Sequence, residues 1–471
     1  MAAQIATLAC IGLIMILFAL DRDRSMRTSP ALWLAVMWLA IAGSRNVSEW
    51  LQLGNPVDAS DRYMEGSPVD RNVLMLIMAI GVITLAQRTK RMQRILRANA
   101  PVIAYFVLCG VSFVWSDFPL ISLKRWFRGL GDIVIVLVIL TDPNPIMAIK
   151  RVFTRLAFVL LPVSVLFIRY YPEYGRAYGM DGSQYWTGVS GGKNGLGVMC
   201  LMYGIAVIWR WIIEYQAPKS RARTRRLIAL TITSVIAMWL LWIADSKTSL
   251  ASLALVTGLI AVIGLFRVGR KRAVIHAMVL FIVSACFSVL FLGIGSSALQ
   301  VIGRDPSLTG RTDVWKLVLS FAVNPIVGAG YESFWLGQRL IDIIRINGGI
   351  NQAHNGYIEV YLNLGAAGLA ALAGIIVTGY RKIVAGFRLN PQLSMLRLAY
   401  FVIAIVYNFT EGSFKMMSSV WIGFLFANMA LPETWKTMSR KTVVSGVSES
   451  TATGFEPAQI VSSPLHHFQP A

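Results

Sequence analysis

Thirteen apolar runs, separated by polar connections, cover nearly half of this 471-residue chain and restrict what it can fold into. Of its residues, 56% are hydrophobic and only 14% are charged, too few charges for the surface of a soluble protein of this length. Such runs indicate membrane-spanning helices, whose backbone hydrogen bonds are satisfied within each segment. The runs cover approximately residues 5–20, 31–43, 73–86, 101–115, 131–141, 152–168, 195–213, 227–243, 250–266, 274–293, 357–380, 398–409 and 417–431.

The runs predict an all-α polytopic membrane protein with about 12–13 transmembrane helices. Several runs are shorter than the roughly 20 residues that a perpendicular span needs, so their helices are expected to extend into the flanking residues. The first run has no basic segment before it and no small-residue cleavage motif after it, so we expect a retained helix. One transmembrane domain over 1–435 is expected, including a long loop at 294–356, followed by a disordered cytoplasmic tail over 436–471.

The net charge of +21 is concentrated in short connections between apolar runs. Four connections are strongly basic, which places them in the cytoplasm by the positive-inside rule: 87–100, 214–226, 267–272 and 381–397. The alternate connections, such as 44–72 and 294–356, mix acids and bases and are expected on the outer face. Anionic lipid headgroups are the natural counter-charge of the basic loops. Nucleic acid is therefore not an expected partner, whereas the lipid bilayer is.

Basic residues on the outer face are unexpected, because the positive-inside rule concentrates lysine and arginine in cytoplasmic loops. Arg125 and Arg128 lie three residues apart, on one face of a predicted helix. They are either interfacial arginines whose charged ends reach the headgroups, or ligands of a diphosphate, whose oxygens arginine binds bidentately.

Two further lysines are expected on the outer face. Lys193 follows Gly191 and Gly192 in a glycine-rich turn that opens a helix, where backbone N–H groups can face an anion. Tight helix packing explains the glycines equally well, but not the lysine. Lys247 lies in the connection Asp245-Ser246-Lys247-Thr248-Ser249, which is either an ordinary polar hairpin or a site with a charge held near membrane depth.

The long outer loop begins near Arg311, in the segment GRTDVW, and ends at His354, in AHNGY. Of the four histidines, only His354 is predicted to lie on the outer face. A neutral imidazole can accept a proton from a sugar hydroxyl near neutral pH. The outer loops contain no DxD, HExxH or GxSxG motif, and their acids lack the spacing of metal ligands. We therefore expect neither a metal nor another cofactor.

Together these segments resemble the O-antigen ligase/polymerase superfamily, and in particular the bacterial exopolysaccharide polymerases. The resemblance extends from about residue 70 to 430 and depends on the order and outer-face placement of five segments: WSDFPLISLKRWFRGLG, SGGKNGLG, DSKTS, GRTDVW and NQAHNGYIEVYLNLG.

The resemblance implies a metal-independent glycosyltransferase in the bacterial inner membrane, with a membrane-embedded, GT-C-like helical fold and its active site facing the periplasm. The donor would be an oligosaccharide linked to undecaprenyl diphosphate, and a flippase and a chain-length co-polymerase would be partners. The implied diphosphate ligands are Arg125, Arg128, Lys193, Lys247 and Arg311. The implied base that activates the acceptor hydroxyl is His354. Relatives usually carry arginine where this chain has Lys247, which keeps the charge but loses the bidentate fork.

This chemistry is physically consistent with the residues. The leaving group of a glycosyl diphosphate is an anion, and basic side chains can stabilise the charge that develops on its oxygen. Two alternatives stay open. A ligase would transfer the glycan to a lipid or protein acceptor. A secondary transporter or lipid-linked glycan flippase would use charges near the midplane, but the chain shows no internal repeat.

Overall fold

In a computed structural model of the chain, the described residues are 1–23, 27–52, 66–179, 182–265, 271–291, 309–347 and 350–429. The expected tail over 436–471 lies outside them, as does part of the long loop. The helices of the first half are α1 (Ala2–Leu20), α2 (Leu32–Gly43), α3 (Val47–Trp50), α5 (Pro68–Ala86), α6 (Thr89–Arg97), α7 (Ala100–Val111), the 3₁₀ helix η1 (Ser112–Trp115), α8 (Pro119–Leu140), α9 (Pro145–Tyr170) and α10 (Pro172–Gly175).

The second half begins with a small antiparallel hairpin, in which β1 (Arg176–Tyr178) pairs with β2 (Gln184–Trp186). The helices that follow are α11 (Lys193–Gln216), α12 (Arg221–Ile243), α13 (Lys247–Leu265), α14 (Arg272–Phe291), α16 (Thr309–Ser320), α17 (Gly337–Asn347), α18 (Gly356–Gly386), α19 (Pro391–Tyr407) and α20 (Ser419–Met429).

The chain is a polytopic helical membrane protein, as its apolar runs predict. Among the described residues, eight helices are long and apolar enough to cross a membrane, or nine if the bent pair formed by α6 and α7 with η1 is one span. The remaining predicted runs lie on α2, α8, α19 and α20. Three of these have only 12, 17 and 11 residues, and α8 carries charges in its first half. The predicted 12–13 apolar segments are therefore helices, but not all are long enough to span by length alone.

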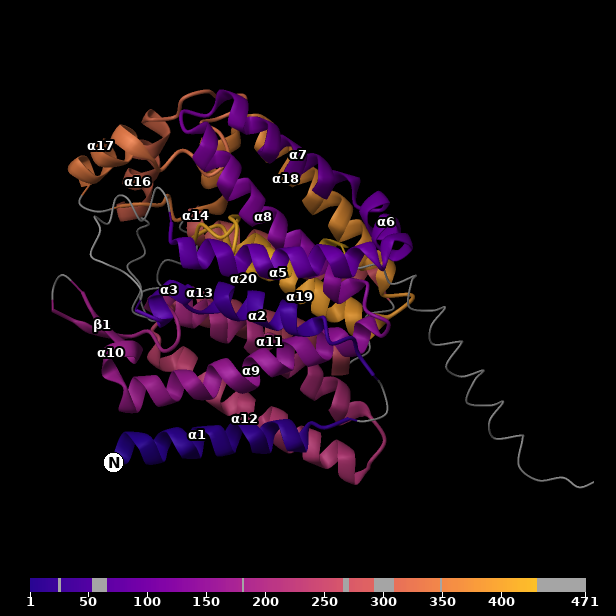
Figure 1. The fold of residues 1–471 in the computed structure, drawn as a ribbon. Coiled ribbons are helices and arrows are strands. Elements are labelled where there is room, and N and C mark those ends of the chain that lie inside the picture. Colours follow the sequence, from indigo (N-terminus) through magenta and orange to yellow (C-terminus); the bar gives the residue numbers. More distant parts are fainter. Residues whose placement is uncertain are drawn as a thin grey trace, which may run out of the picture. The chain divides into compact units, whose positions relative to one another are not determined.

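The connections gather at two ends of the bundle. We call the end that carries α3, α10, α16 and α17 the loop end, and the end that carries α6 the basic end (Figure 1). The N-terminus lies at the loop end (Figure 1), where the hydroxyls of Thr7 and Tyr171 are 2.8 Å apart. At the basic end, Lys382 Nζ donates to Asn99 Oδ1 at 2.7 Å and so links the end of α18 to the start of α7. The predicted outer-face site residues all belong to segments that meet at the loop end.

Helix α18 is interrupted at Gly365, where the backbone adopts φ 62° and ψ −159°. The break leaves backbone groups without partners inside the helix, and the loop before α17 satisfies them. Ala366 and Ala367 donate to the carbonyls of Pro325 and Ile326, each at 2.9 Å. In return, the N–H groups of residues 329 and 330 donate to carbonyls of the helix at 3.0 and 2.9 Å. The loop over 321–336 is therefore joined to α18 by backbone hydrogen bonds and is part of the helical bundle.

We expect Gly365→Ala to lower the free energy of unfolding by about 1–3 kcal/mol, because this backbone conformation is nearly restricted to glycine. An added Cβ would also collide with the backbone of Ile326. The measurement is thermal unfolding of the full-length protein in detergent. Gly258→Ala in α13 is the matched control, since that glycine has open space around it and an ordinary φ. Equal midpoints for the two variants would contradict the role given to the break.

Candidate active site

His354 is held in an unusual backbone conformation at the start of α18. Its φ is +50°, in the left-handed region that non-glycine residues seldom adopt and that is enriched at functional sites. The next residue, Asn355, caps the helix, because its Oδ1 accepts from the N–H groups of Tyr357 and Ile358 at 3.0 and 3.1 Å. The rigid cap fixes the direction in which the His354 side chain leaves the backbone.

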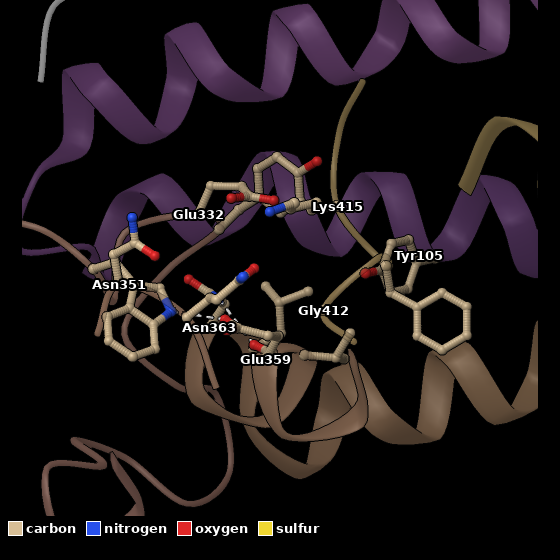
Figure 2. A pocket seen from close by; sticks show the side chains of 13 residues that line it. Tyr105, Glu332, Asn351, Glu359, Asn363, Gly412 and Lys415 are labelled. Carbon is tan, nitrogen blue, oxygen red and sulfur yellow. Dashed lines mark hydrogen bonds between the residues drawn. The ribbon is translucent and has the colours of Figure 1, made fainter. Parts of the chain in front are cut away.

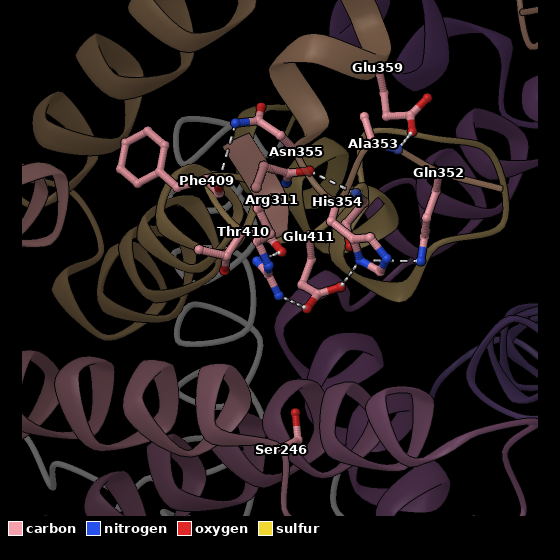
Figure 3. Close-up of polar contacts among 12 residues, drawn as sticks. Ser246, Arg311, Gln352, Ala353, His354, Asn355, Glu359, Phe409, Thr410 and Glu411 are labelled. Carbon is pink, nitrogen blue, oxygen red and sulfur yellow. Dashed lines mark hydrogen bonds and ion pairs between the residues drawn. The ribbon is translucent and has the colours of Figure 1, made fainter. Parts of the chain in front are cut away.

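Glu411 joins His354 to Arg311 (Figure 3). His354 Nδ1 lies 3.4 Å from one carboxylate oxygen of Glu411, and a guanidinium nitrogen of Arg311 lies 3.3 Å from the other. Arg311 also donates to the carbonyl of Thr410. A carboxylate can only accept, so a hydrogen bond between His354 and Glu411 uses the tautomer that is protonated on Nδ1 and leaves Nε2 basic. The Glu411 side chain is 11% exposed and that of His354 is 32% exposed, so the imidazole is the accessible member of the pair.

A second carboxylate fixes the backbone before His354. Glu359, one turn into α18, accepts from the N–H of Ala353 at 2.5 Å and from Trp335 Nε1 at 2.8 Å. The carbonyl of Ala353 accepts from Trp315 Nε1 at 2.9 Å. The α16 helix, the 321–336 loop and α18 thus hold the same backbone segment, and the side chain of His354 is positioned by all three.

The two lysines lie on neighbouring elements. Lys193 is the first residue of α11 and Lys247 is the first residue of α13, and both are exposed. Gly197 packs so tightly on Ser246 that an added Cβ would collide with its side chain, whereas the two glycines before Lys193 have open space. In Figure 3 the Ser246 hydroxyl points toward the side of the site that holds Arg311 and Glu411. Packing thus explains Gly197 but not the glycines beside Lys193.

The two arginines of α8 face different surroundings. Arg125 donates to the backbone carbonyl of Glu332, in the loop over 321–336. Arg128 donates to Asn46 Oδ1 at 3.1 Å, and the carboxylate of Asp132 supplies a nearby negative charge. The contacts of Arg128 thus run to the α2–α3 junction, which favours a structural role for this side chain.

Of the predicted site residues, the structure brings Arg311 and His354 together. The side-chain contacts of Arg311 are with Thr410 and Glu411, and those of His354 are with Gln352 and Glu411. No group of three or more His, Cys, Asp or Glu among the described residues is placed to hold a metal ion.

A pocket lies next to the segment that precedes His354 and is shown in Figure 2. Its volume is about 50 Å³, and 13 residues line it, among them Glu332, Asn351, Gln352, Glu359 and Lys415. Gln352 connects it to the site, because its amide nitrogen lies 3.4 Å from His354 Nδ1.

Tyr331 also lines the pocket. Burial and the neighbouring Glu332 carboxylate raise the pKa of the Tyr331 phenol well above its ordinary value. Tyr331 therefore keeps its proton at neutral pH and remains a hydroxyl donor.

The sequence analysis did not single out Glu411 or Glu359. Glu411 is an acid in the short connection between the last two apolar runs, and Glu359 lies five residues after His354, at the start of an apolar run. Both positions are visible as acids next to apolar runs on the predicted outer face. Only the fold shows that the connection at Glu411 returns to His354.

Comparison with known proteins gives two findings. Residues 232–373, which include Lys247, Arg311 and His354, match a family described as O-antigen ligase. Over 295 residues, the chain is 26% identical to the exopolysaccharide production protein ExoQ of Rhizobium meliloti (strain 1021). That alignment covers 59% of this chain and 64% of the relative, so the chain spans slightly less than two thirds of the relative's length.

Proposed function

Since this membrane protein carries an O-antigen ligase family domain over residues 232–373, we propose that it is a glycosyltransferase that polymerises lipid-linked oligosaccharide repeat units into an exopolysaccharide. The proposed donor is an oligosaccharide on undecaprenyl diphosphate, and the proposed place of reaction is the periplasmic face of a bacterial inner membrane. A flippase and a chain-length co-polymerase are proposed partners.

The observation that carries the proposal is the Arg311–Glu411–His354 arrangement at the loop end. It places a base and a cation on either side of one buried carboxylate. In the proposed step, His354 Nε2 takes the proton of an acceptor hydroxyl, and the hydroxyl oxygen bonds to the anomeric carbon of the donor sugar. The bond between that carbon and the phosphate oxygen breaks, and the electron pair leaves with the undecaprenyl diphosphate.

Charge explains how the leaving group is stabilised. The departing diphosphate is anionic, and a guanidinium can donate two parallel hydrogen bonds to its oxygens. Arg311 is 29% exposed and so retains surface for a ligand while it contacts Glu411. Lys193 and Lys247, exposed at the starts of neighbouring helices, are the proposed further diphosphate ligands, together with Arg125. Arg128 is a weaker candidate, because it is bound to Asn46.

Deleting the gene in its host and analysing surface glycans and the undecaprenyl-linked pool distinguishes a polymerase from a ligase. We expect high-molecular-weight polymer to be lost and single repeat units to accumulate on the carrier. Intact polymer that stays on its carrier would instead establish a ligase, the activity that the matched family's description names. If neither the surface glycans nor the undecaprenyl-linked pool changed, polymerase and ligase would both be rejected and a transporter would be favoured.

A further inference from the structure

We propose that the pocket beside His354 binds the terminal sugar of the acceptor glycan, as a subsite separate from the one that holds the donor diphosphate. The inference rests on the proposed function. The pocket reaches the residue that contacts His354, since Gln352 lines it and its amide nitrogen lies 3.4 Å from His354 Nδ1. Glu359 lines the same pocket and holds the backbone N–H of Ala353. A ligand that touches Gln352 is therefore one side chain away from His354.

Three polar side chains of the pocket have hydrogen-bonding capacity left for a ligand. Among the described residues, neither the Glu332 carboxylate, the Asn351 amide nor the Lys415 ammonium forms a hydrogen bond or ion pair, although all three line the pocket. In Figure 2 these side chains surround the same space. The Glu332 carboxylate accepts hydrogen bonds, the Lys415 ammonium donates them, and the Asn351 amide can do both. Trp335 adds an aromatic ring. Hydroxyl-bearing rings are the ligand class that uses all of these groups.

The charges of the lining distinguish the acceptor from the donor diphosphate. Two carboxylates, Glu332 and Glu359, line the pocket against one ammonium, that of Lys415. Like charges repel, so this lining disfavours a diphosphate. Arg311 does not line the pocket and lies on the other side of Glu411. The anion is therefore expected beside Arg311 and the hydroxyl groups of the acceptor sugar beside Gln352, with His354 between them.

The size of the pocket limits how much of the acceptor enters it. A volume of about 50 Å³ holds a few water molecules, which is less than a whole sugar ring. One edge of the terminal sugar therefore enters the pocket, and the rest of the glycan stays outside. Recognition by hydroxyl hydrogen bonds makes the site selective, because a sugar that lacks the matching hydroxyl loses its contacts with Glu332, Asn351 and Lys415.

The test uses the full-length protein in lipid vesicles, with lipid-linked repeat units from cells that lack the gene as donor. The acceptor is the free oligosaccharide released from the same lipid by mild acid. Glu332→Gln and Asn351→Ala are expected to raise the acceptor KM about tenfold and to leave the donor KM unchanged. Lys316→Ala, an exposed cation on α16 away from the pocket, is the control and should change neither. An unchanged acceptor KM, or an equal rise in the donor KM, would overturn the proposal.

A binding measurement separates this proposal from the proposed function. Calorimetry with the free oligosaccharide should show binding to the unsubstituted protein and to Arg311→Ala, and about tenfold weaker binding to Glu332→Gln. That result supports the subsite even if no transfer is found, in which case only the proposed function fails. No binding, or equal binding to Glu332→Gln, overturns the subsite whether or not the protein is active.

Discussion

Replacement of His354 by alanine is expected to lower the rate of glycan transfer by about a hundredfold or more, the usual contribution of a general base. The substitution removes the only group proposed to take the acceptor proton, while the capping side chain of Asn355 remains in place. The rate is measured as polymer formed per protein by the purified protein in vesicles. Binding of the donor lipid should be nearly unchanged, because the diphosphate is assigned to Arg311 and the lysines.

His276→Ala is the matched control for this experiment. His276 is the other histidine among the described residues; it lies on α14, and its Nδ1 is 2.8 Å from the hydroxyl of Tyr380. Its replacement removes an imidazole from the same protein without touching the loop-end site, so transfer should stay near the unsubstituted rate. Normal polymer formation by His354→Ala would contradict the assignment of the base.

Replacement of Arg311 by alanine is expected to lower the rate about a hundredfold or more, the cost of removing one donor that stabilises developing anionic charge. Arg311→Lys should recover only part of the loss, because lysine restores the charge but not the bidentate fork. Arg311→Ala also leaves the buried Glu411 without its guanidinium partner, so the donor KM and the rate are both expected to change. Kinetics against the concentration of lipid-linked donor measure the two effects.

Arg339→Ala is the control for charge and size. Arg339 lies on α17 and pairs with Asp117 at 2.6 Å, so it is an arginine of the same loop end in a similar ion pair outside the site. Asp117 is the exposed member of this pair, and an ion pair at the surface contributes at most about 1 kcal/mol, so its loss should leave turnover unchanged. Equal losses in Arg311→Ala and Arg339→Ala would show that the effect is general electrostatics and not a contact with the diphosphate.

The helical architecture could be predicted because apolar runs and basic connections are local features of the sequence. Within the described residues, each of the thirteen predicted runs coincides with a helix, from α1 to α20. Their lengths were less predictable, since tertiary packing extends some helices and shortens others. The run over 152–168 lies within the 26-residue α9, whereas the run over 417–431 lies on an 11-residue helix that is almost fully enclosed by its neighbours.

The site could be predicted only in part. The sequence placed Arg311 and His354 in one outer loop, but their connection through Glu411 depends on how the segment after α19 returns to the start of α18. The contact of the 321–336 loop with α18 at Gly365 could not be predicted from the sequence either, because it depends on backbone hydrogen bonds between distant segments. Local patterns identify which residues are unusual, and the fold decides which of them meet.

The most direct measurement is transfer by the purified full-length protein in vesicles supplied only with lipid-linked repeat units, without nucleotide sugar, ATP or added metal. The proposed chemistry predicts polymer longer than one repeat, together with one released undecaprenyl diphosphate for each linkage formed, and loss of both in His354→Ala. Vesicles that retain every repeat unit on its carrier and release no diphosphate, while the protein is folded and inserted, would contradict the proposal that this chain is a glycosyltransferase.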